Sequence, residues 1–170
     1  PAPYIHKVGN LTGKLAISTC SDLWYNGGNH ANNQHQEERM NTPRLETERL
    51  ILRKFTENDI GALYLVLKDE VANVFLPWFP LKSMDEARTF FATRYAADYA
   101  KPQAYAYAIC LKEDNYPIGY IKVDMDDGHD FGYGLRQEFW HQGIVTEAGK
   151  AVITQVKRDG LPYILSLIHI

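Results

Sequence analysis

One junction in the chain constrains the fold more than any other feature, because a strand-like run leads directly into a helix-like run. Residues 130–135 alternate large side chains with glycines, which predicts a strand that bends or bulges near a bound ligand. Apolar residues recur four apart within residues 146–158, which predicts an amphipathic helix. A strand, a tight turn and a helix are therefore expected in direct succession.

Gly143 lies in the turn between these two runs. The first N–H groups of a helix have no partner inside the helix and carry a partial positive charge. A glycine there lets a phosphate approach the backbone closely, so the turn predicts an anion site. An ordinary strand-to-helix turn explains the same residues, because one glycine is a much weaker signal than a full phosphate-loop signature.

The other elements follow from periodicity and capping. Thr56 is followed by an acidic first turn, and Ser83 and Glu86 have capping-box spacing, so each marks a helix start. In chain order we expect a strand over 49–55, helices over 57–68 and 84–99, strands over 104–111, 117–124 and 130–136, and the helix over 146–158. This order predicts an α+β or α/β domain with an antiparallel meander.

Composition narrows the class of protein. The chain has 170 residues and a formal net charge of -3, which suits one domain and gives no reason to expect nucleic acid. No run approaches the roughly 20 apolar residues of a membrane span, and no secretory signal is present at the start. Cys20 and Cys110 lack metal-ligand spacing, so we expect a reduced cytoplasmic protein without a metal.

The two ends of the chain differ from its middle. Residues 1–39 are polar and lack periodicity, and we interpret Met40 as the start of translation, with residues 37–39 encoded by a purine-rich ribosome-binding site. His30 and His35 in this tail make a poor metal-ligand set. Residues 165–170, Leu-Ser-Leu-Ile-His-Ile, match a translated transposon-end sequencing adapter, although a short apolar strand fits them too. The expected domain is therefore 40–164, flanked by a polar tail at 1–39 and a non-native tail at 165–170.

Residues 140–148, Trp-His-Gln-Gly-Ile-Val-Thr-Glu-Ala, resemble the acyl-CoA-binding motif of the GNAT family of N-acyltransferases, Gln/Arg-x-x-Gly-x-Gly/Ala. Trp140 and Val145 depart from that pattern, but an aromatic residue at this place followed by Thr-Glu-Ala is similar to the RimJ/RimL branch. Residues 45–53 resemble the first strand of that branch, and residues 76–80 resemble its loop before the second helix. The three matches occur in the family's order within residues 44–164.

The resemblance implies a three-layer fold, with a mixed, largely antiparallel central sheet and helices on both faces. The family continues after this point with a strand, a helix and two more strands, including a tyrosine often assigned as general acid. We therefore expect the C-terminal part of the fold to be missing, which would leave a strand edge uncovered and lower solubility and activity.

The implied reaction is transfer of an acetyl group from acetyl-CoA to a primary amine by direct attack in a ternary complex, with a general base that takes the amine proton. Asp130 is the first candidate for that base, against the alternative of a solvated residue closing a turn. His129 and Glu138 are weaker candidates. The acceptor is a protein N-terminus or a small-molecule amine, and the enzyme is expected to be a monomer or homodimer.

The resemblance also implies the binding residues. The cofactor residues are expected to be Leu135, Arg136, Trp140, His141, Gln142, Gly143, Ile144, Val145 and Thr146. Backbone amides of residues 142–146 would hold the pyrophosphate, and residues 135 and 136 would pair with the pantetheine arm. Trp140 has the alternative of a core anchor. Trp78, Phe79 and Asp124 are the expected substrate-binding residues. A non-catalytic acyl-CoA-binding or interaction domain, or an inactive fragment of such an enzyme, remains the alternative function.

Overall fold

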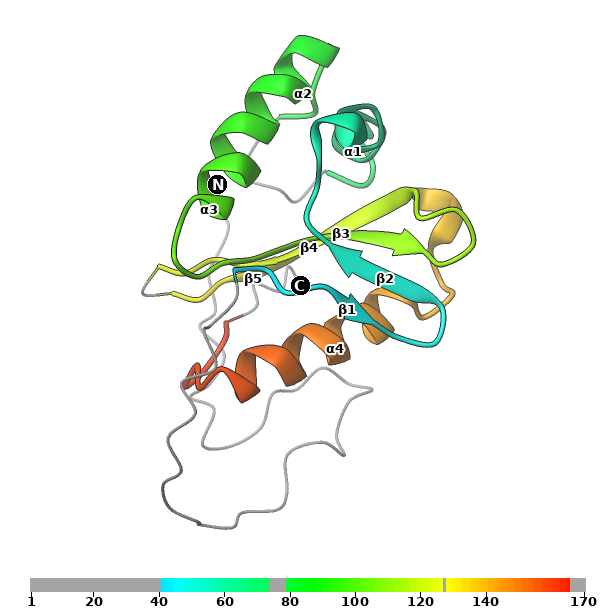
Figure 1. The fold of residues 1–170 in the computed structure, drawn as a ribbon. Helices are drawn as coiled ribbons and strands as arrows, with labels where there is room; N and C mark the ends of the chain where they lie inside the picture. Colours follow the sequence, from blue (N-terminus) through cyan, green and yellow to red (C-terminus); the bar gives the residue numbers. More distant parts are fainter. Residues whose placement is uncertain (1–40, 74–78, 127, 166–170) are drawn as a thin grey trace, which may run out of the picture.

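Five antiparallel strands form the sheet, and they lie side by side in the same order as they occur in the chain (Figure 1). The computed structural model describes residues 41–73, 79–126 and 128–165. The strands are β1 (Leu45–Glu46), β2 (Leu50–Arg53), β3 (Tyr105–Leu111), β4 (Pro117–Val123) and β5 (Phe131–Leu135). Neighbouring strands pair antiparallel throughout this order, so the predicted meander is confirmed.

Helices cover both faces of this sheet, which gives three layers (Figure 1). On one face lie η1 (Glu57–Asp59), α1 (Ile60–Leu67), α2 (Met84–Phe90), η2 (Phe91–Ala96) and α3 (Ala97–Tyr99). On the other face lies α4 (Ile144–Arg158), which a short turn of helix, η3 (Gln137–Phe139), precedes in the chain. The expected α+β architecture with helices on both faces is confirmed.

Both predicted helix caps are present. The Thr56 N–H and hydroxyl donate to the Asp59 carboxylate at 2.7 and 2.8 Å, and that carboxylate also pairs with Arg53 at 2.7 Å. The Ser83 hydroxyl accepts a hydrogen bond from the Glu86 N–H at 3.2 Å. These side chains satisfy amides that have no partner within the helix, which fixes where each helix begins.

Two predicted boundaries were wrong. The run 45–53 is not one strand but a hairpin of β1 and β2, because the Thr47 N–H donates to the Leu50 carbonyl at 3.0 Å and reverses the chain. The last helix begins at Ile144, two residues before the predicted start, because its first residues follow directly on a turn closed by Gly143. The predicted helix over 84–99 is continuous but adopts π-helical geometry over 91–96.

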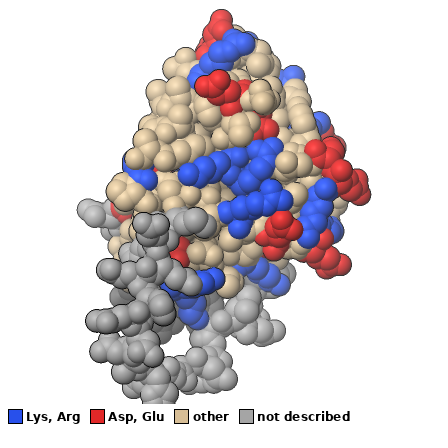
Figure 2. All heavy atoms as spheres, in the orientation of Figure 1, with Lys and Arg blue, Asp and Glu red and all other residues tan. Residues whose placement is uncertain are grey.

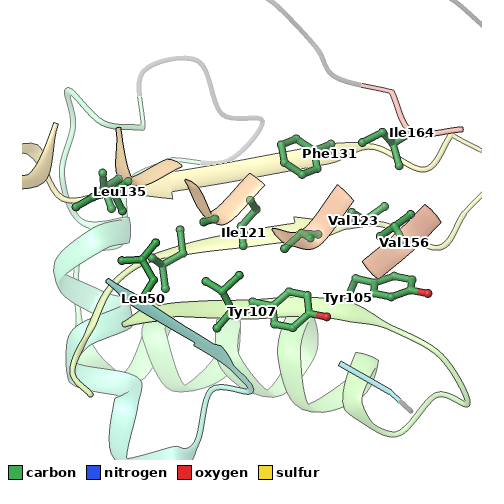
Figure 3. Close-up of a cluster of buried hydrophobic side chains, with 14 of the residues drawn as sticks. Leu50, Tyr105, Tyr107, Ile121, Val123, Phe131, Leu135, Val156 and Ile164 are labelled. Carbon is green, nitrogen blue, oxygen red and sulfur yellow. The ribbon is translucent and has the colours of Figure 1, made fainter. Parts of the chain in front are cut away.

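The strands have two different faces. Phe131 and Leu135 of β5 pack with residues such as Val152 of α4 in one buried cluster, which Figure 3 shows spread across β2 to β5. Tyr120 of β4 belongs to the other cluster, under α1 and η2. Because side chains alternate along a strand, residues 130, 132 and 134 face the layer of α1 to α3.

The parallel neighbour of β5 is a single residue in the described part of the chain. Leu165 forms an isolated parallel bridge with Asp130, its N–H donating to the His129 carbonyl at 3.0 Å and its carbonyl accepting from Phe131 at 2.6 Å. Residues 166–170, the rest of the predicted adapter-derived tail, lie outside the described residues, as do residues 1–40. Among the described residues, the expected mixed character of the sheet is limited to this one-residue parallel bridge, since the five strands pair antiparallel.

Charges of both signs are mixed on the face of the molecule drawn in Figure 2. Basic side chains gather across the middle of that face, with acidic ones directly beside them (Figure 2). Within the described ranges, no helix combines the length and the apolar character needed to cross a bilayer.

Candidate functional site

A pocket of about 370 Å³ lies where the outer edge of β5 meets the start of α4. Its volume falls in the range of small-molecule sites, roughly 300 to 1,000 Å³. Its lining residues are Ala72, Tyr133, Gly134, Leu135, Phe139, Trp140, His141, Gly143, Ile144, Val145 and Thr146. Seven of the nine predicted cofactor residues are in this set, and the two that are absent are Arg136 and Gln142.

Gly143 directs the start of α4 toward the pocket. Its backbone is left-handed, with φ 73° and ψ 8°, a conformation that other residues adopt only at a cost. The first hydrogen bond of the helix runs from the Glu147 N–H to the Gly143 carbonyl at 3.0 Å. The amides of residues 144–146 precede that bond and have no partner within the helix, so they are available to an anion in the pocket.

The outer edge of β5 forms the second part of the pocket. The Arg136 N–H donates inward to the Ile118 carbonyl at 3.0 Å, and hydrogen-bonding direction alternates along an antiparallel strand. The backbone groups of Tyr133 and Leu135 therefore point outward, away from β4. The prediction that Arg136 pairs with an extended ligand is wrong for its N–H, because the sheet already uses that group.

The position of Trp140 is compatible with both of the roles that the sequence left open. Its indole N–H donates to the Leu135 carbonyl at 2.8 Å, and its ring packs against the core cluster under α4. The same residue lines the pocket. Gln142 does not line it, because its side chain donates to the Glu138 carbonyl at 3.0 Å.

The glycine turn is tied to the β1–β2 hairpin. Glu147 in the first turn of α4 accepts hydrogen bonds from the Thr47 hydroxyl at 2.6 Å and from the Arg49 N–H at 3.0 Å. The Arg49 guanidinium reaches Glu147 at 2.8 Å and the Gln142 carbonyl at 3.1 Å. Burial alone would raise the pKa of Glu147, but these hydrogen bonds hold it below its usual value. The carboxylate is therefore ionised and fixed.

A second set of hydrogen bonds fixes the part of the pocket that Ala72 lines. The Gln137 amide donates to both oxygens of the Asp69 carboxylate, at 2.8 and 2.7 Å. The same carboxylate accepts from the N–H of Ala72, a pocket residue, at 3.0 Å. Nothing in the local sequence connects residues 69 and 137, so sequence reasoning missed Ala72 and this contact.

Asp130 lies one residue before β5, on the sheet face turned to α1, α2 and α3. Burial raises the pKa of its carboxyl, and the nearby charges of Asp124 and Asp126 raise it further. Two residues along, Gly132 has open space where a side chain would lie. An elevated carboxyl pKa beside open space suits a proton acceptor.

Tyr120 covers the next position on the same face. A side-chain carbon on Gly134 would lie 2.5 Å from the Tyr120 ring, so the ring rests directly on that glycine. Tyr120 is only 4% exposed and its hydroxyl has no hydrogen-bond partner. The sequence signals neither fact, since both depend on the pairing of Tyr120 with Gly134 across β4 and β5.

Two of the three predicted substrate residues lie in the described part of the chain, and their surroundings differ. Asp124 accepts from Lys122 at 2.6 Å, and Lys122 also binds Asp98 at 2.8 Å. Burial would lower the pKa of Lys122, but these hydrogen bonds raise it. Phe79 is 90% exposed and lines no part of the pocket, while Trp78 lies outside the described residues.

No metal centre forms among the residues that the structure describes. Groups of three or more His, Cys, Asp or Glu side chains in metal-binding arrangement are absent from those ranges.

Comparisons with known proteins show the family to which this chain is similar. The sequence profile of the Acetyltransferase (GNAT) domain matches residues 49–170. YoaA of Bacillus subtilis strain 168, an uncharacterized N-acetyltransferase, is 26% identical over 116 residues, which are 66% of this chain. This chain spans 65% of the length of that curated relative.

Solved structures share the fold. A GNAT-family acetyltransferase from Bacillus anthracis superposes with a TM-score of 0.59 at 20% identity, covering 69% of this chain and 68% of that one. RimL, a ribosomal α-N-protein acetyltransferase in complex with coenzyme A, superposes with a TM-score of 0.58 at 26% identity, covering 67% of each chain. GNAT enzymes use acetyl-CoA. Because the profile covers well over half of the chain, this protein belongs to the GNAT family of acetyltransferases.

Proposed function

We propose that this protein transfers an acetyl group from acetyl-CoA to a primary amine while both substrates are bound. The observation that carries the proposal is a single pocket that joins the first amides of α4 to the outer edge of β5. The amides of residues 143–146 suit a pyrophosphate, each contact contributing roughly 0.3 to 1 kcal/mol. The strand edge suits the two amide groups of a pantetheine arm.

The bridge at Leu165 limits how far the arm can follow the strand. Phe131 donates its N–H to Leu165 and the Leu135 carbonyl accepts from Trp140, so an extended arm pairs with Tyr133 and the Leu135 N–H and leaves β5 beside Gly132. The thioester of acetyl-CoA would then lie next to Gly132. Gly132 has no side chain, so the space beside the backbone at this position is open.

The acceptor amine would enter from the face of α1 to α3, between Asp130 and Tyr120. Its nitrogen forms a bond to the thioester carbonyl carbon, and the carbon–sulfur bond breaks. The amine proton passes to Asp130, directly or through water, and coenzyme A leaves as the thiol or thiolate. The raised pKa of Asp130 makes it a better proton acceptor than an exposed aspartate.

A weak base of this kind favours an acceptor that is easy to deprotonate. An α-amine with a pKa near 7.7 to 8.0 requires about 1 kcal/mol to lose its proton at pH 7, whereas a lysine-type amine near 10.4 requires about 4 to 5 kcal/mol. We therefore propose a protein N-terminus as the acceptor, in the manner of the RimJ/RimL branch. The similarity to RimL and the motifs at residues 45–53 and 140–148 support that assignment.

The proposal is tested by mixing the full chain with acetyl-CoA and measuring free thiol release with N-terminal peptides, lysine-containing peptides with blocked N-termini, and spermidine. We expect release with unblocked peptides and weaker release with the other amines. A protein that binds no acetyl-CoA would refute the proposed reaction.

The role of Asp130 is tested by the Asp130→Asn variant. We expect turnover to fall about a hundredfold or more, the scale of a lost general base, with the affinity for acetyl-CoA unchanged. Asp114→Asn is the matched control, because Asp114 lies in the turn between β3 and β4, where it accepts from the Tyr116 N–H at 2.9 Å. Equal turnover in the two variants would remove Asp130 from the mechanism.

A further inference from the structure

Two sequence motifs nearly a hundred residues apart meet in one hydrogen-bonded cluster. Thr47 and Arg49 come from the β1–β2 turn, and Glu147 comes from the first turn of α4. One Glu147 oxygen accepts from the Thr47 hydroxyl at 2.6 Å and from the Arg49 N–H at 3.0 Å. The other accepts from the Arg49 guanidinium at 2.8 Å. Thr47 is itself fixed, since its hydroxyl accepts from the Leu50 N–H at 3.0 Å.

The same guanidinium reaches the glycine turn itself. Its second nitrogen donates to the Gln142 carbonyl at 3.1 Å, and a side chain on Gly143 would lie 3.9 Å from that nitrogen. Arg49 therefore fixes the peptide that leads into the left-handed glycine, and so the direction of the amides that follow. Its side chain is 46% exposed, so it contributes little to the core.

The charges add a second reason for this contact. Glu147 places a carboxylate in the first turn of α4, where it interacts favourably with the helix dipole but repels any anion bound at the same end. Arg49 neutralises that carboxylate. A pyrophosphate would therefore meet the partial positive charge of the amides without an opposing negative charge beside them.

We propose that Arg49 is a positioning residue for coenzyme A, which orients the turn at Gly143 through the Gln142 carbonyl and neutralises Glu147 next to the pyrophosphate site. This inference rests on the proposed function, because it concerns the same pocket. It assigns a role to the Thr-Glu-Arg run of residues 47–49, which lines no part of the pocket.

Titration calorimetry of the full chain with coenzyme A tests the proposal, using the variants Arg49→Gln, Arg49→Lys, Glu147→Gln and the double variant Arg49→Gln/Glu147→Gln. We expect Arg49→Gln to weaken binding roughly tenfold, the scale of one uncompensated charge near an anion at a protein surface. Arg49→Lys should weaken coenzyme A binding less than Arg49→Gln does, because lysine keeps the positive charge. It should still bind more weakly than the wild type, because one ammonium group cannot reach both acceptors of the guanidinium. The double variant should recover most of the loss, because no unpaired carboxylate remains.

Arg44→Gln is the matched control. Arg44 lies next to β1, and its exposed ion pair is with Glu46 at 2.8 Å. We expect coenzyme A to bind this variant as it binds the wild-type protein. Thermal unfolding of every variant separates binding from folding, and Arg49→Lys replaces Arg49→Gln if the latter does not unfold cooperatively.

The outcomes separate the two proposals. A wild-type protein that binds no coenzyme A would refute the proposed function. If the wild-type protein binds coenzyme A and both Arg49→Gln and Arg49→Lys bind it as tightly as the wild type does, the positioning role alone is overturned. A double variant as weak as Arg49→Gln, with no recovery, would overturn the charge-neutralising part and leave only the hydrogen bond to Gln142.

Discussion

The two ends of β5 present different chemistry. At its C-terminal end, Leu135 leads into the turn whose backbone lines the pocket, and the nearby carboxylate of Glu147 is paired with Arg49. At its N-terminal end, the Asp130 carboxylate lies among like charges, two residues before the open space beside Gly132. One end is therefore suited to hold a cofactor and the other to move a proton.

The difference teaches what each half of the reaction requires. A pyrophosphate is recognised by N–H groups that every residue carries, so a left-handed glycine and a helix start are enough. An acceptor amine must be recognised and deprotonated by particular side chains, which come from different strands. Changes in backbone geometry should therefore affect cofactor binding, and changes in side chains should affect turnover.

The largest effect is expected from Gly143→Val, which tests whether the cofactor end depends on the backbone. Valine at φ 73° is strained by about 1 to 2 kcal/mol, and the turn will rotate its amides away from the pocket to relieve that strain. We expect the affinity for coenzyme A to fall about a hundredfold, as measured by calorimetry.

Gly160→Val is the control for this substitution. Gly160 has a similar backbone, with φ 79°, but lies after the C-terminal end of α4, away from the pocket. It should lose a comparable amount of stability and bind coenzyme A normally. If both variants lose binding equally, strain rather than site geometry accounts for the result.

The next largest effect is on stability, from substitutions on the face of β5 that is turned to α1, α2 and α3. Gly134→Ala would place a carbon 2.5 Å from the Tyr120 ring, which is buried and cannot move aside, so we expect a loss of about 1 to 3 kcal/mol of unfolding free energy. Gly132→Ala meets nothing within 4 Å, so its stability should match the wild type. Urea unfolding compares the two, and equal losses would contradict the open space beside Gly132.

A smaller effect is expected from Tyr120→Phe. Its hydroxyl is buried without a partner, so removing it should leave stability unchanged or raise it by up to about 1 kcal/mol. If the hydroxyl donates to the reacting groups, turnover falls about fivefold to tenfold while the Kd for acetyl-CoA stays constant. We expect that fall.

Tyr107→Phe provides the comparison for Tyr120. Tyr107 also has a buried hydroxyl without a partner, but it lies in the cluster on the α4 face. Its loss should change neither stability nor turnover by much. A Tyr120→Phe variant that keeps full turnover, like Tyr107→Phe, would show that the hydroxyl has no part in the reaction.

The smallest effect is the opposite pH dependence of the two carboxylates. Folding lowers the pKa of Glu147, so its contribution to stability is present at neutral pH and is lost as pH falls through its folded pKa. Folding raises the pKa of Asp130, so the wild-type protein loses stability as pH rises from the usual Asp range through the raised value.

Urea unfolding at pH 4 and pH 7 measures both contributions. Between these two values, Glu147→Gln should become less stable relative to wild type as pH rises, and Asp130→Asn should become more stable. Each change should be under about 1 kcal/mol, because both sites are near solvent. The same sign for both variants would contradict the contrast between the two ends of β5.

Local sequence brought most of the predicted cofactor residues together at the C-terminal end of β5, because these residues are contiguous in the chain. The alternation of glycines in β5, the glycine turn and the periodicity of α4 lie within 30 residues, and they brought seven predicted residues into one pocket. The error at Arg136 arose because sequence alone gives no hydrogen-bonding direction along an edge strand. The error at the first strand arose because Thr47 and Leu50 hydrogen-bond to each other and reverse the chain between β1 and β2.

The sequence by itself determined the order of strands and helices, the helix caps and the glycine junction, since each depends on residues close together in the chain. Only the tertiary structure decided that Arg49 contacts the turn before Gly143, that Tyr120 covers Gly134 and that open space lies over Gly132. These contacts join strands and helices that are distant in sequence, and no local propensity encodes the register that brings them together.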